Sequence, residues 1–298
     1  MNTPFLKYSK IYYIFSGLLA LAAIASIIIF GLRFGIDFLG GSILEVDFDK
    51  RPENSAIQEK LKNLNLGEIT IQPTGERGVI LRMRDVDESL HQEILKNLGD
   101  ISSVNELHFE SIGPVIGREL RQKTIILIIV SLIALLLYIA ISFRKVTFPF
   151  SGWQFGIISI VALFFDVLLP IGFFALLGRF YNIQLSIPII TALLTILGYT
   201  INDKVIVFDR VRENISRIRG VDFNALVNQS LNEILFRSLS TGTCTLLVLF
   251  FIFWLGGETL KYFALTLIVG IAVGTYSSLF LASPLLVSWL KWRKRSAS

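Results

Sequence analysis

Residues 153–177 read WQFGIISIVALFFDVLLPIGFFALL, an apolar stretch with a single charged residue, Asp166, near its middle. A helix needs about 20 residues to cross the roughly 30 Å of hydrocarbon in a bilayer, so this stretch is long enough to span a membrane. The composition agrees, because 53% hydrophobic and 17% charged residues with a mean hydropathy of +0.65 do not describe a soluble globule. The sequence therefore predicts a polytopic α-helical membrane protein with six transmembrane helices. The five further spans carry no charge and lie at 11–32, 124–143, 180–202, 238–257 and 262–290.

The distribution of Lys and Arg indicates how these spans are oriented. Four segments, before the first span, after the second, between the fourth and fifth, and after the sixth, together hold 14 Lys and Arg residues. The short loops on the other side hold only Arg179 and Lys261. Loops rich in Lys and Arg stay on the cytoplasmic side of a membrane, so we expect both termini to be cytoplasmic. This topology explains the net charge of +5 without a role in binding nucleic acid.

The predicted organisation follows from these spans and their orientation. It consists of a cytoplasmic N-terminus at 1–10, a first transmembrane helix at 11–32, an exterior domain at 33–121, a five-helix transmembrane region at 122–290 that includes a cytoplasmic segment at 203–237, and a basic cytoplasmic tail at 291–298.

The exterior part has the sequence pattern of a small folded domain. Its patterns predict strands at 43–48, 68–72, 79–84 and 104–110, helices at 52–65 and 87–98, and a turn at 73–75. The order βαββαβ is that of a ferredoxin-like α+β domain. One Cys and two His exclude a disulfide framework and cysteine-based metal sites. We expect neither covalent chemistry nor a cofactor or bound metal.

Asp166 is the one acidic residue in the middle of a predicted span. A carboxylate there costs about 2.5 to 3.5 kcal/mol on insertion scales, so it normally faces a protein or water-lined interior and serves a function. Pro170, four residues further on, has no N–H to bond the carbonyl of Asp166, which leaves a free backbone acceptor and favours a kink. Asp166 is therefore a candidate proton carrier. The alternative is a static hydrogen-bond partner that locks two helices together.

Polar residues form a stripe on the fourth predicted span. At 100° per residue the stripe covers about 80° of the helix surface. Lipid offers no hydrogen bonds, so this face belongs against another helix or a wet cavity. With Asp166 facing it, the stripe predicts a hydrated proton path; the alternative is ordinary polar contact between helices. The stripe consists of Gln184, Pro188, Thr191, Thr195, Tyr199 and Asn202.

Small residues and paired charges indicate further helix contacts. Gly152 with Gly156, and Gly270 with Gly274, are four residues apart, a spacing that lets helix backbones approach closely. The segment 203–219 carries opposite charges on shared helical faces. It reads as a basic amphipathic extension at the cytoplasmic surface, which either contacts anionic lipid or a partner, or is simply solvated.

Several groups of residues together resemble one known family. They are Asp37-Phe38-Leu39-Gly40-Gly41, Gly113-Pro114 with Gly117-Arg118, Gly198-Tyr199-Thr200-Ile201-Asn202-Asp203 running into Phe208-Asp209-Arg210-Val211-Arg212-Glu213-Asn214, and the closing Gly256-Gly257-Glu258, Gly270 and Gly274-Thr275-Tyr276-Ser277-Ser278. The pattern is similar to that of the SecF subunits in the bacterial SecD/SecF protein-export family, relatives of the proton-driven resistance-nodulation-division transporters. The resemblance covers nearly the whole chain, and the run from Asn202 to Asn214 is its most specific part.

The resemblance implies a complex with SecD beside the SecYEG channel in the bacterial cytoplasmic membrane. Such subunits use the proton-motive force to promote late stages of preprotein export, with the acid of the third span as proton carrier. Asp166 matches that acid, and Asn202 and Asp203 match family residues at the end of the fourth span. H⁺ is the implied coupling ion and Na⁺ the alternative, because a carboxylate beside hydroxyls can bind either. The candidates for carrying or relaying the ion are Asp166, Asn202, Asp203, Thr191, Thr195 and Tyr199.

Two positions depart from the family pattern. Phe165 stands where His is frequent, so a mechanism that needs this His is in doubt. Lys204 stands where Thr or Ser is usual, and it places a cation beside Asp203 in the sequence.

Two other functions fit the same residues. One is a proton-driven small-molecule efflux transporter of the same superfamily, although one small exterior domain cannot by itself form the large substrate pockets of such transporters. The other is a passive scaffold of the translocon without ion coupling. After the first helix, Asp37, Phe38, Gly40 and Gly41 predict a hinge or a tight turn, since glycine adopts backbone angles that other residues resist.

Overall fold

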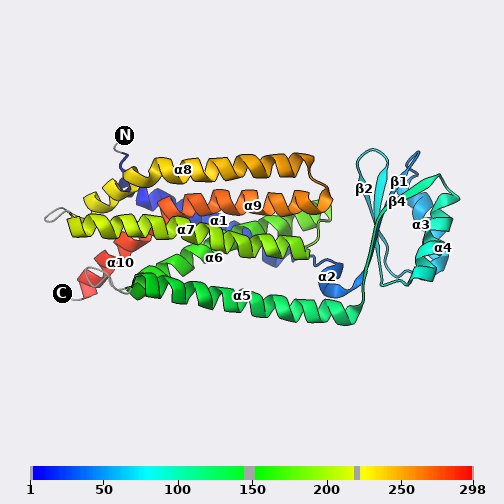
Figure 1. Ribbon diagram of the computed structural model, residues 1–298, viewed down its shortest axis with the longest axis horizontal. Coiled ribbons are helices and arrows are strands. Elements are labelled where there is room, and N and C mark those ends of the chain that lie inside the picture. Colours follow the sequence, from blue (N-terminus) through cyan, green and yellow to red (C-terminus); the bar gives the residue numbers. More distant parts are fainter. Residues whose placement is uncertain (1–2, 144–151, 218–221, 297–298) are drawn as a thin grey trace. The chain divides into compact units, whose positions relative to one another are not determined.

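The computed structural model describes residues 3–143, 152–217 and 222–296. They form two compact units (Figure 1). The helical unit comprises Met1–Leu32, Leu127–Tyr181 and Ile187–Ser298, and the sheet unit comprises Arg33–Ile126 and Asn182–Ser186.

Long apolar helices make up the helical unit. Within the described residues, six helical segments are long and apolar enough to cross a membrane, which confirms the predicted fold class. The last of them is composite, because α9, the π-helix η3 and α10 follow one another directly. The helices are η1 (Phe5–Tyr8), α1 (Ser9–Phe30), α5 (Pro114–Ser142), α6 (Gly152–Tyr181), α7 (Ile187–Arg217), α8 (Phe223–Leu255), α9 (Glu258–Ser277), η3 (Ser278–Ala282) and α10 (Ser283–Ser296).

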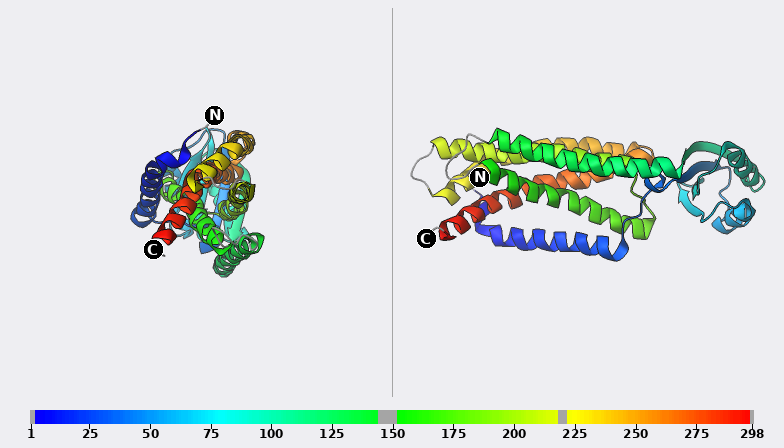
Figure 2. Two further views of the ribbon diagram at one scale, coloured as in Figure 1. Left: turned by 90° about the vertical axis from the view of Figure 1, so that its left-hand side faces the viewer. Right: turned by 90° about the horizontal axis from the view of Figure 1, so that it is seen from below.

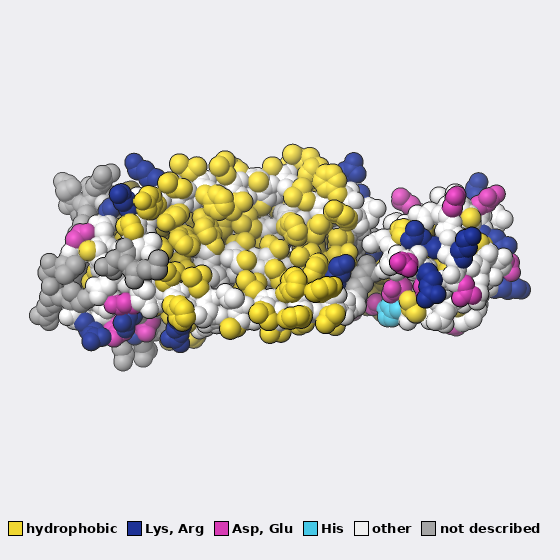
Figure 3. Space-filling model, turned by 90° about the horizontal axis from the view of Figure 1, so that it is seen from above, with side chains coloured by type: hydrophobic (Ala, Val, Ile, Leu, Met, Phe, Trp, Pro, Cys, Tyr) yellow, Lys and Arg dark blue, Asp and Glu magenta, His cyan; other side chains and the backbone are white. Residues whose placement is uncertain are grey.

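The helices α6, α7 and α9 form the centre of the helical unit. α9 contacts α6, α7 and α8, and α6 also contacts α1 and α7 (Figure 2). In their most apolar parts, 44% of α6, 50% of α7 and 56% of the segment from α9 to α10 are buried, against 6% of α5. Figure 3 shows one face of the helical unit, on which hydrophobic side chains form a broad band. Lipid or another membrane protein covers such a surface.

A four-stranded antiparallel sheet forms the sheet unit together with two helices. The strand order is β2-β3-β1-β4, and all three neighbouring pairs are antiparallel. Apart from short helical turns, the chain follows the predicted βαββαβ order of a ferredoxin-like domain. The elements are α2 (Ile36–Leu39), β1 (Gly41–Phe48), α3 (Asn54–Leu61), η2 (Lys62–Leu64), β2 (Thr70–Thr74), β3 (Gly78–Met83), α4 (Glu88–Gly99) and β4 (Val104–Ile112).

The core of the sheet unit follows from the alternation of apolar residues along β1. Leu44, Val46 and Phe48 point to one face of the sheet and are buried there. α3 and α4 pack against this face with apolar residues four apart, as amphipathic helices do. These residues are Ile57 and Leu61 in α3 and Ile94 and Leu98 in α4.

Asp87 caps the first turn of α4. Its side chain accepts a hydrogen bond from the Leu90 N–H at 3.0 Å and another from the Ser89 hydroxyl at 3.0 Å. These two bonds hold the pKa of the Asp87 carboxyl below its usual range, because both favour the charged form. The cap therefore depends on the ionised side chain.

The predicted start of the fourth span is wrong. α6 continues to Tyr181 and α7 begins only at Ile187. Between them Leu185 forms a parallel bridge, in which its N–H donates to the Arg33 carbonyl at 2.7 Å and its carbonyl accepts from the Gly35 N–H at 2.8 Å. This bridging segment carries no charge, so the absence of charged residues does not distinguish it from the span that follows.

The predicted turn at 73–75 is displaced along the chain. Pro73 lies inside β2, and the turn occupies residues 75–77. β2 is an edge strand that pairs only with β3, so one side of its backbone needs no ladder hydrogen bonds. Edge strands tolerate proline for this reason.

Candidate functional site

Asp166 lies at a crossing of three helices in the helical unit, and its carboxylate is fully buried. The Lys204 ammonium of α7 donates to Asp166 Oδ2 at 2.5 Å. The Ser277 hydroxyl, from the last residue of α9, donates to Asp166 Oδ1. Both carboxylate oxygens are therefore engaged, each by a different helix.

The arrangement is a buried ion pair. Asp166 and Lys204 both have 0% side-chain exposure, and the ammonium also approaches the Thr200 carbonyl at 3.5 Å. Removing two charges from water is unfavourable, and their mutual attraction compensates only when the geometry is good and hydrogen bonds satisfy the remaining groups. Here the pair carries no net charge as long as Asp166 is ionised and Lys204 protonated. Binding a proton at Asp166 would leave the ammonium without its partner.

Two features of the helices bring these groups together. Thr200 and Lys204 are four residues apart and lie on the same face of α7. Gly274 lets α9 approach that face, since a Cβ atom built there would overlap the Thr200 side chain and lie 3.5 Å from Asp166 Oδ2. The absence of a side chain at Gly274 is thus a requirement of the site.

The predicted glycine contacts differ in their surroundings. A Cβ at Gly270 would overlap the Ile196 side chain, so Gly270 and Gly274 both line the contact between α9 and α7. A Cβ at Gly156 would lie 3.4 Å from the Leu136 side chain, an ordinary contact with α5. The surroundings of Gly152 lie outside what the structure describes.

A second carboxylate, Asp203, lies beside the ion pair. Its side chain is buried, with 4% exposure, and it adjoins Lys204 in α7. The Thr200 hydroxyl is also buried and has no hydrogen-bond partner among the described residues. The site therefore holds two carboxylates, one ammonium and two hydroxyls.

The polar stripe of α7 does not face Asp166, which corrects the sequence-based expectation. Thr191 and Thr195 are exposed and donate to the carbonyls four residues earlier, at 3.0 and 2.8 Å. Asn202 is exposed as well. At 100° per residue, Thr200 and Lys204 lie about 180° and 220° around the helix from Thr191, so the stripe occupies the opposite face.

Two members of the predicted stripe have other surroundings. The Tyr199 hydroxyl bonds the Thr245 hydroxyl of α8 at 2.9 Å. Gln184 precedes α7 and is therefore not on the helix. A role in relaying protons remains a prediction for Thr191, Thr195, Tyr199 and Asn202.

The basic extension of α7 packs against the first part of α8. The Arg210 guanidinium bonds Glu233 at 2.5 Å and Glu213 at 2.6 Å. The Asn214 amide donates to the Ser230 hydroxyl and to Glu233, both at 2.9 Å. One face of the extension is thus bound to α8 and is not simply solvated.

The remaining residues of this motif take different positions. Phe208 is buried and contacts the Phe155 ring with centroids 5.1 Å apart. Asp209 and Arg212 form an ion pair with each other on the exposed surface. A polar cavity of about 320 Å³ lies between the two helices, lined by Ile206, Asp209, Arg210, Glu213, Glu233, Ile234 and Arg237.

The motif after the first helix forms a tight turn in the sheet unit. Asp37 and Phe38 lie in α2, and Gly40 ends it with φ +81°. Gly41 begins β1 with φ +138°. A Cβ at Gly40 would lie 2.8 Å from the Pro114 Cα atom, so only glycine fits. A hinge at this turn remains a prediction.

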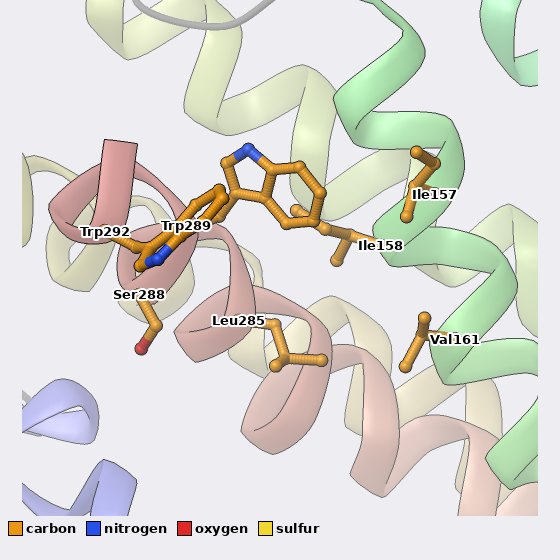
Figure 4. Close-up of a pocket in the computed structure, with 7 residues that line it drawn as sticks. All are labelled: Ile157, Ile158, Val161, Leu285, Ser288, Trp289 and Trp292. Atoms are coloured by element: carbon orange, nitrogen blue, oxygen red, sulfur yellow. The ribbon is translucent and has the colours of Figure 1, made fainter. Parts of the chain in front are cut away.

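A second cavity, of about 330 Å³, is apolar and lies apart from the ion pair (Figure 4). It holds no titratable side chain. Among the described residues, no group of three or more His, Cys, Asp or Glu is placed to hold a metal ion. The apolar cavity is lined by Ile157, Ile158, Val161, Leu285, Ser288, Trp289 and Trp292.

Sequence reasoning found Asp166 but missed its partners. The sequence places Lys204 beside Asp203, and it shows Ser277 only as part of the motif 274–278. A signal for Lys204 was present, because it falls on the apolar face of α7 between Leu197 and Val211, where a lone charge requires a buried counter-charge. No comparable signal marks Ser277.

Comparisons with known proteins agree with the helical and sheet units just described. The family model "Protein export membrane protein SecD/SecF, C-terminal" matches residues 91–292, and the model "SecD/SecF GG Motif" matches residues 25–50. The chain is 37% identical to Protein translocase subunit SecF of Thermobaculum terrenum, over 93% of this chain and 91% of that protein. It is 35% identical to the SecF subunit of Petrotoga mobilis, over 99% and 98%.

A solved structure shares the fold. The crystal structure of SecDF from Thermus thermophilus, described as a translocon-associated membrane protein, matches with a TM-score of 0.85 at 33% identity. The match covers 96% of this chain but 38% of the SecDF chain, which is therefore much longer. The chain belongs to the SecD/SecF family of protein-export membrane proteins, as a SecF subunit.

Proposed function

We propose that this chain is an accessory subunit of the Sec protein translocase, which uses the proton-motive force to promote late stages of preprotein export across the cytoplasmic membrane. Its membership of the SecF subunits supports a transport role in a multi-pass membrane protein. The observation that carries the ion coupling is the fully buried contact between Asp166 and Lys204, at a crossing of α6, α7 and α9.

The proposed coupling follows from charge balance at this crossing. With Asp166 ionised, the ion pair joins α6 to α7. When Asp166 binds a proton, Lys204 loses its counter-charge, and Asp203, a buried carboxylate on α7 itself, can take this role. Protonation thus favours a different packing of α7 against α6.

The available energy is of the right size for such a change. One elementary charge that crosses 100 mV provides about 2.3 kcal/mol. This corresponds to a shift of about fiftyfold between two conformations. Since α6, α7 and α9 are the most buried helices, a change in their packing reaches the rest of the helical unit.

Two surfaces support a partner in the membrane. Asn202 is exposed on α7 on the same face as Thr191 and Thr195, whose hydroxyls already bond backbone carbonyls, and lipid offers an exposed carboxamide no hydrogen bonds. α5 is almost entirely exposed as well. SecD is the proposed partner, because SecF-like and SecD-like parts occur together in the longer SecDF chain. The SecYEG channel and the translocating preprotein are the further proposed partners.

The proposed orientation places both termini in the cytoplasm. The N-terminal part of the chain, the C-terminal end of α7 and α10 lie toward the same end of the helical unit (Figure 1), and these segments carry Lys7, Arg217 and Lys291. The positive-inside rule assigns this end to the cytoplasm.

The test uses export into inverted membrane vesicles with and without a proton-motive force. The double variant Asp166→Asn/Lys204→Met removes both charges and leaves neither unpaired. It is expected to lose the force-dependent part of export and the associated proton flux. The matched control is Asp222→Asn, which removes a carboxylate at the N-cap of α8, where Asn caps equally well.

Wild-type export by the double variant would show that the ion pair is a static lock and would favour a passive scaffold. Recovery of a self-associated protein with small-molecule transport, in place of a complex with SecD, would favour an efflux transporter.

A further inference from the structure

The Lys204 ammonium occupies the place that a coupling metal cation would need. It lies 2.5 Å from Asp166 Oδ2 and 3.5 Å from the Thr200 carbonyl oxygen, and its side chain is fully buried. Ser277 Oγ bonds the other carboxylate oxygen and also the Gly274 carbonyl at 3.2 Å. Oxygen atoms of α6 and α7 thus contact a cation that is part of the chain, and a hydroxyl of α9 bonds the same carboxylate.

The same oxygen atoms would suit a hard monovalent cation if the ammonium were absent. Such ions take carboxylate, carbonyl and hydroxyl ligands. The crossing offers the Asp166 carboxylate, the Ser277 hydroxyl and the Thr200 carbonyl. The Thr200 hydroxyl is a further ligand, because it is buried and has no hydrogen-bond partner among the described residues.

We propose that Lys204 reserves the Asp166 site for protons and excludes Na⁺. Resting on the proposed function, this inference names the coupling ion and the residue that selects it. A proton needs only a lone pair of a carboxylate oxygen. A Na⁺ ion needs the volume that Lys204 Nζ fills.

The positive charge of Lys204 also opposes the binding of Na⁺, in addition to the volume that its ammonium fills. Two unit charges about 4 Å apart near a protein surface repel by an energy that corresponds to roughly a thousandfold in affinity, and burial increases the effect. A Na⁺ ion beside the fixed ammonium would meet this repulsion. With Thr at position 204, the repulsion disappears and another hydroxyl is added.

The first experiment measures binding and does not depend on transport. Thermal unfolding of the purified full-length protein is compared in NaCl and in choline chloride at equal ionic strength. The wild type is expected to show the same Tm in both salts. Lys204→Thr is expected to gain stability only in Na⁺, with a folded-to-unfolded ratio about a hundredfold higher when Na⁺ is about one hundred times its Kd.

The control is the double variant Lys204→Thr/Asp166→Asn, which lacks the carboxylate and is expected to lose the Na⁺ effect. A wild type that gains from Na⁺ as much as Lys204→Thr would overturn the proposal. So would a folded Lys204→Thr variant that does not respond to Na⁺. If Lys204→Thr does not fold, ²²Na⁺ uptake is measured in vesicles that contain the wild type. Uptake driven by a Na⁺ gradient would overturn the proposal that Lys204 excludes Na⁺, and its absence would support the proposal.

The second experiment separates this inference from the proposed function. Proton flux and preprotein export by the wild type are measured in vesicles with Na⁺ and with choline. Export that requires Na⁺ would refute the selectivity while leaving ion-driven export in place. A wild type without any ion flux, in which only Lys204→Thr binds Na⁺, would refute the proposed coupling while supporting the selectivity.

Discussion

Breaking the ion pair from one side is expected to destabilise the protein far more than removing both partners. Lys204→Met leaves a buried carboxylate, and Asp166→Asn leaves a buried ammonium. Loss of one partner of a buried pair costs about 3 to 5 kcal/mol, because the remaining charge is neither solvated nor paired. Replacing both charges by groups of similar volume is often neutral, and in some proteins stabilising by about 1 to 4 kcal/mol.

The structure allows the two single variants to be ranked. Asp166 can bind a proton after Lys204→Met, which neutralises the buried charge, so this variant is expected near the lower limit of about 3 kcal/mol. After Asp166→Asn, the Ser277 hydroxyl can still donate to the amide oxygen, but the Lys204 ammonium keeps only the Thr200 carbonyl at 3.5 Å until α7 repacks to bring Asp203 to it. This variant is expected to be the less stable of the two.

The assay is a double-mutant cycle followed by thermal unfolding in one detergent at one pH. The double variant Asp166→Asn/Lys204→Met is expected to recover most of the stability that either single variant loses. Losses that simply add in the double variant would refute the reasoning, because additive effects show that the two sites do not interact. The cycle also bears on functional tests, since a loss of export in Asp166→Asn alone would not separate a missing proton carrier from a destabilised crossing.

Three further variants, one of them with a matched control, test other parts of the structure. Gly274→Ala is expected to lower stability by about 1 to 3 kcal/mol, because the new methyl group meets a threonine side chain of α7, whereas Gly198→Ala has open space and is expected to keep or raise the Tm; equal effects would contradict the close contact. The pKa of Asp87 is lowered in the folded protein, so its stabilisation of α4 is present above the unfolded pKa and is lost as the pH falls through the folded pKa. Asp87→Asn keeps a cap that does not titrate, and hydrogen exchange in the first turn of α4 should therefore lose this acid dependence; an unchanged dependence would assign it to another group. Gly40→Ala is expected to raise protease sensitivity after α2, because φ is +81° and Pro114 leaves no space for a methyl group; wild-type resistance would show that the turn relaxes freely.

The sequence predicts most of the fold because the signals for it are local. Hydropathy accumulates along a single helix, so each span is visible without knowledge of its neighbours. Alternation within β1 and the apolar spacing in α4 are equally local, and together they predict the sheet unit. The boundary near Leu185 is missed because its pairing with Arg33 and Gly35 joins segments that are distant in the sequence.

The site is only half predictable for the same reason. A carboxylate in the middle of an apolar span is visible by itself, which identifies Asp166. Its partner depends on how α7 is rotated against α6, and polar periodicity suggested the face with Thr191 and Thr195. The apolar residues around Lys204 define the buried face instead. In a membrane helix that packs against other helices, the position of a lone charge among apolar residues is thus a better guide than a stripe of hydroxyls.

Packing and chemistry coincide at the crossing of α6, α7 and α9. These helices are the most buried, and they hold the ion pair. Because Gly274 has no side chain, α9 packs directly against Thr200 of α7. The crossing therefore has no free space in which a side chain could rearrange alone. When Asp166 changes its partner, the helices themselves must shift. The π-helix Ser278–Ala282 starts directly after Ser277, at the point where regular α-helical bonding in this span is already interrupted. In the proposed function, protonation of Asp166 and a shift in helix packing are therefore one event.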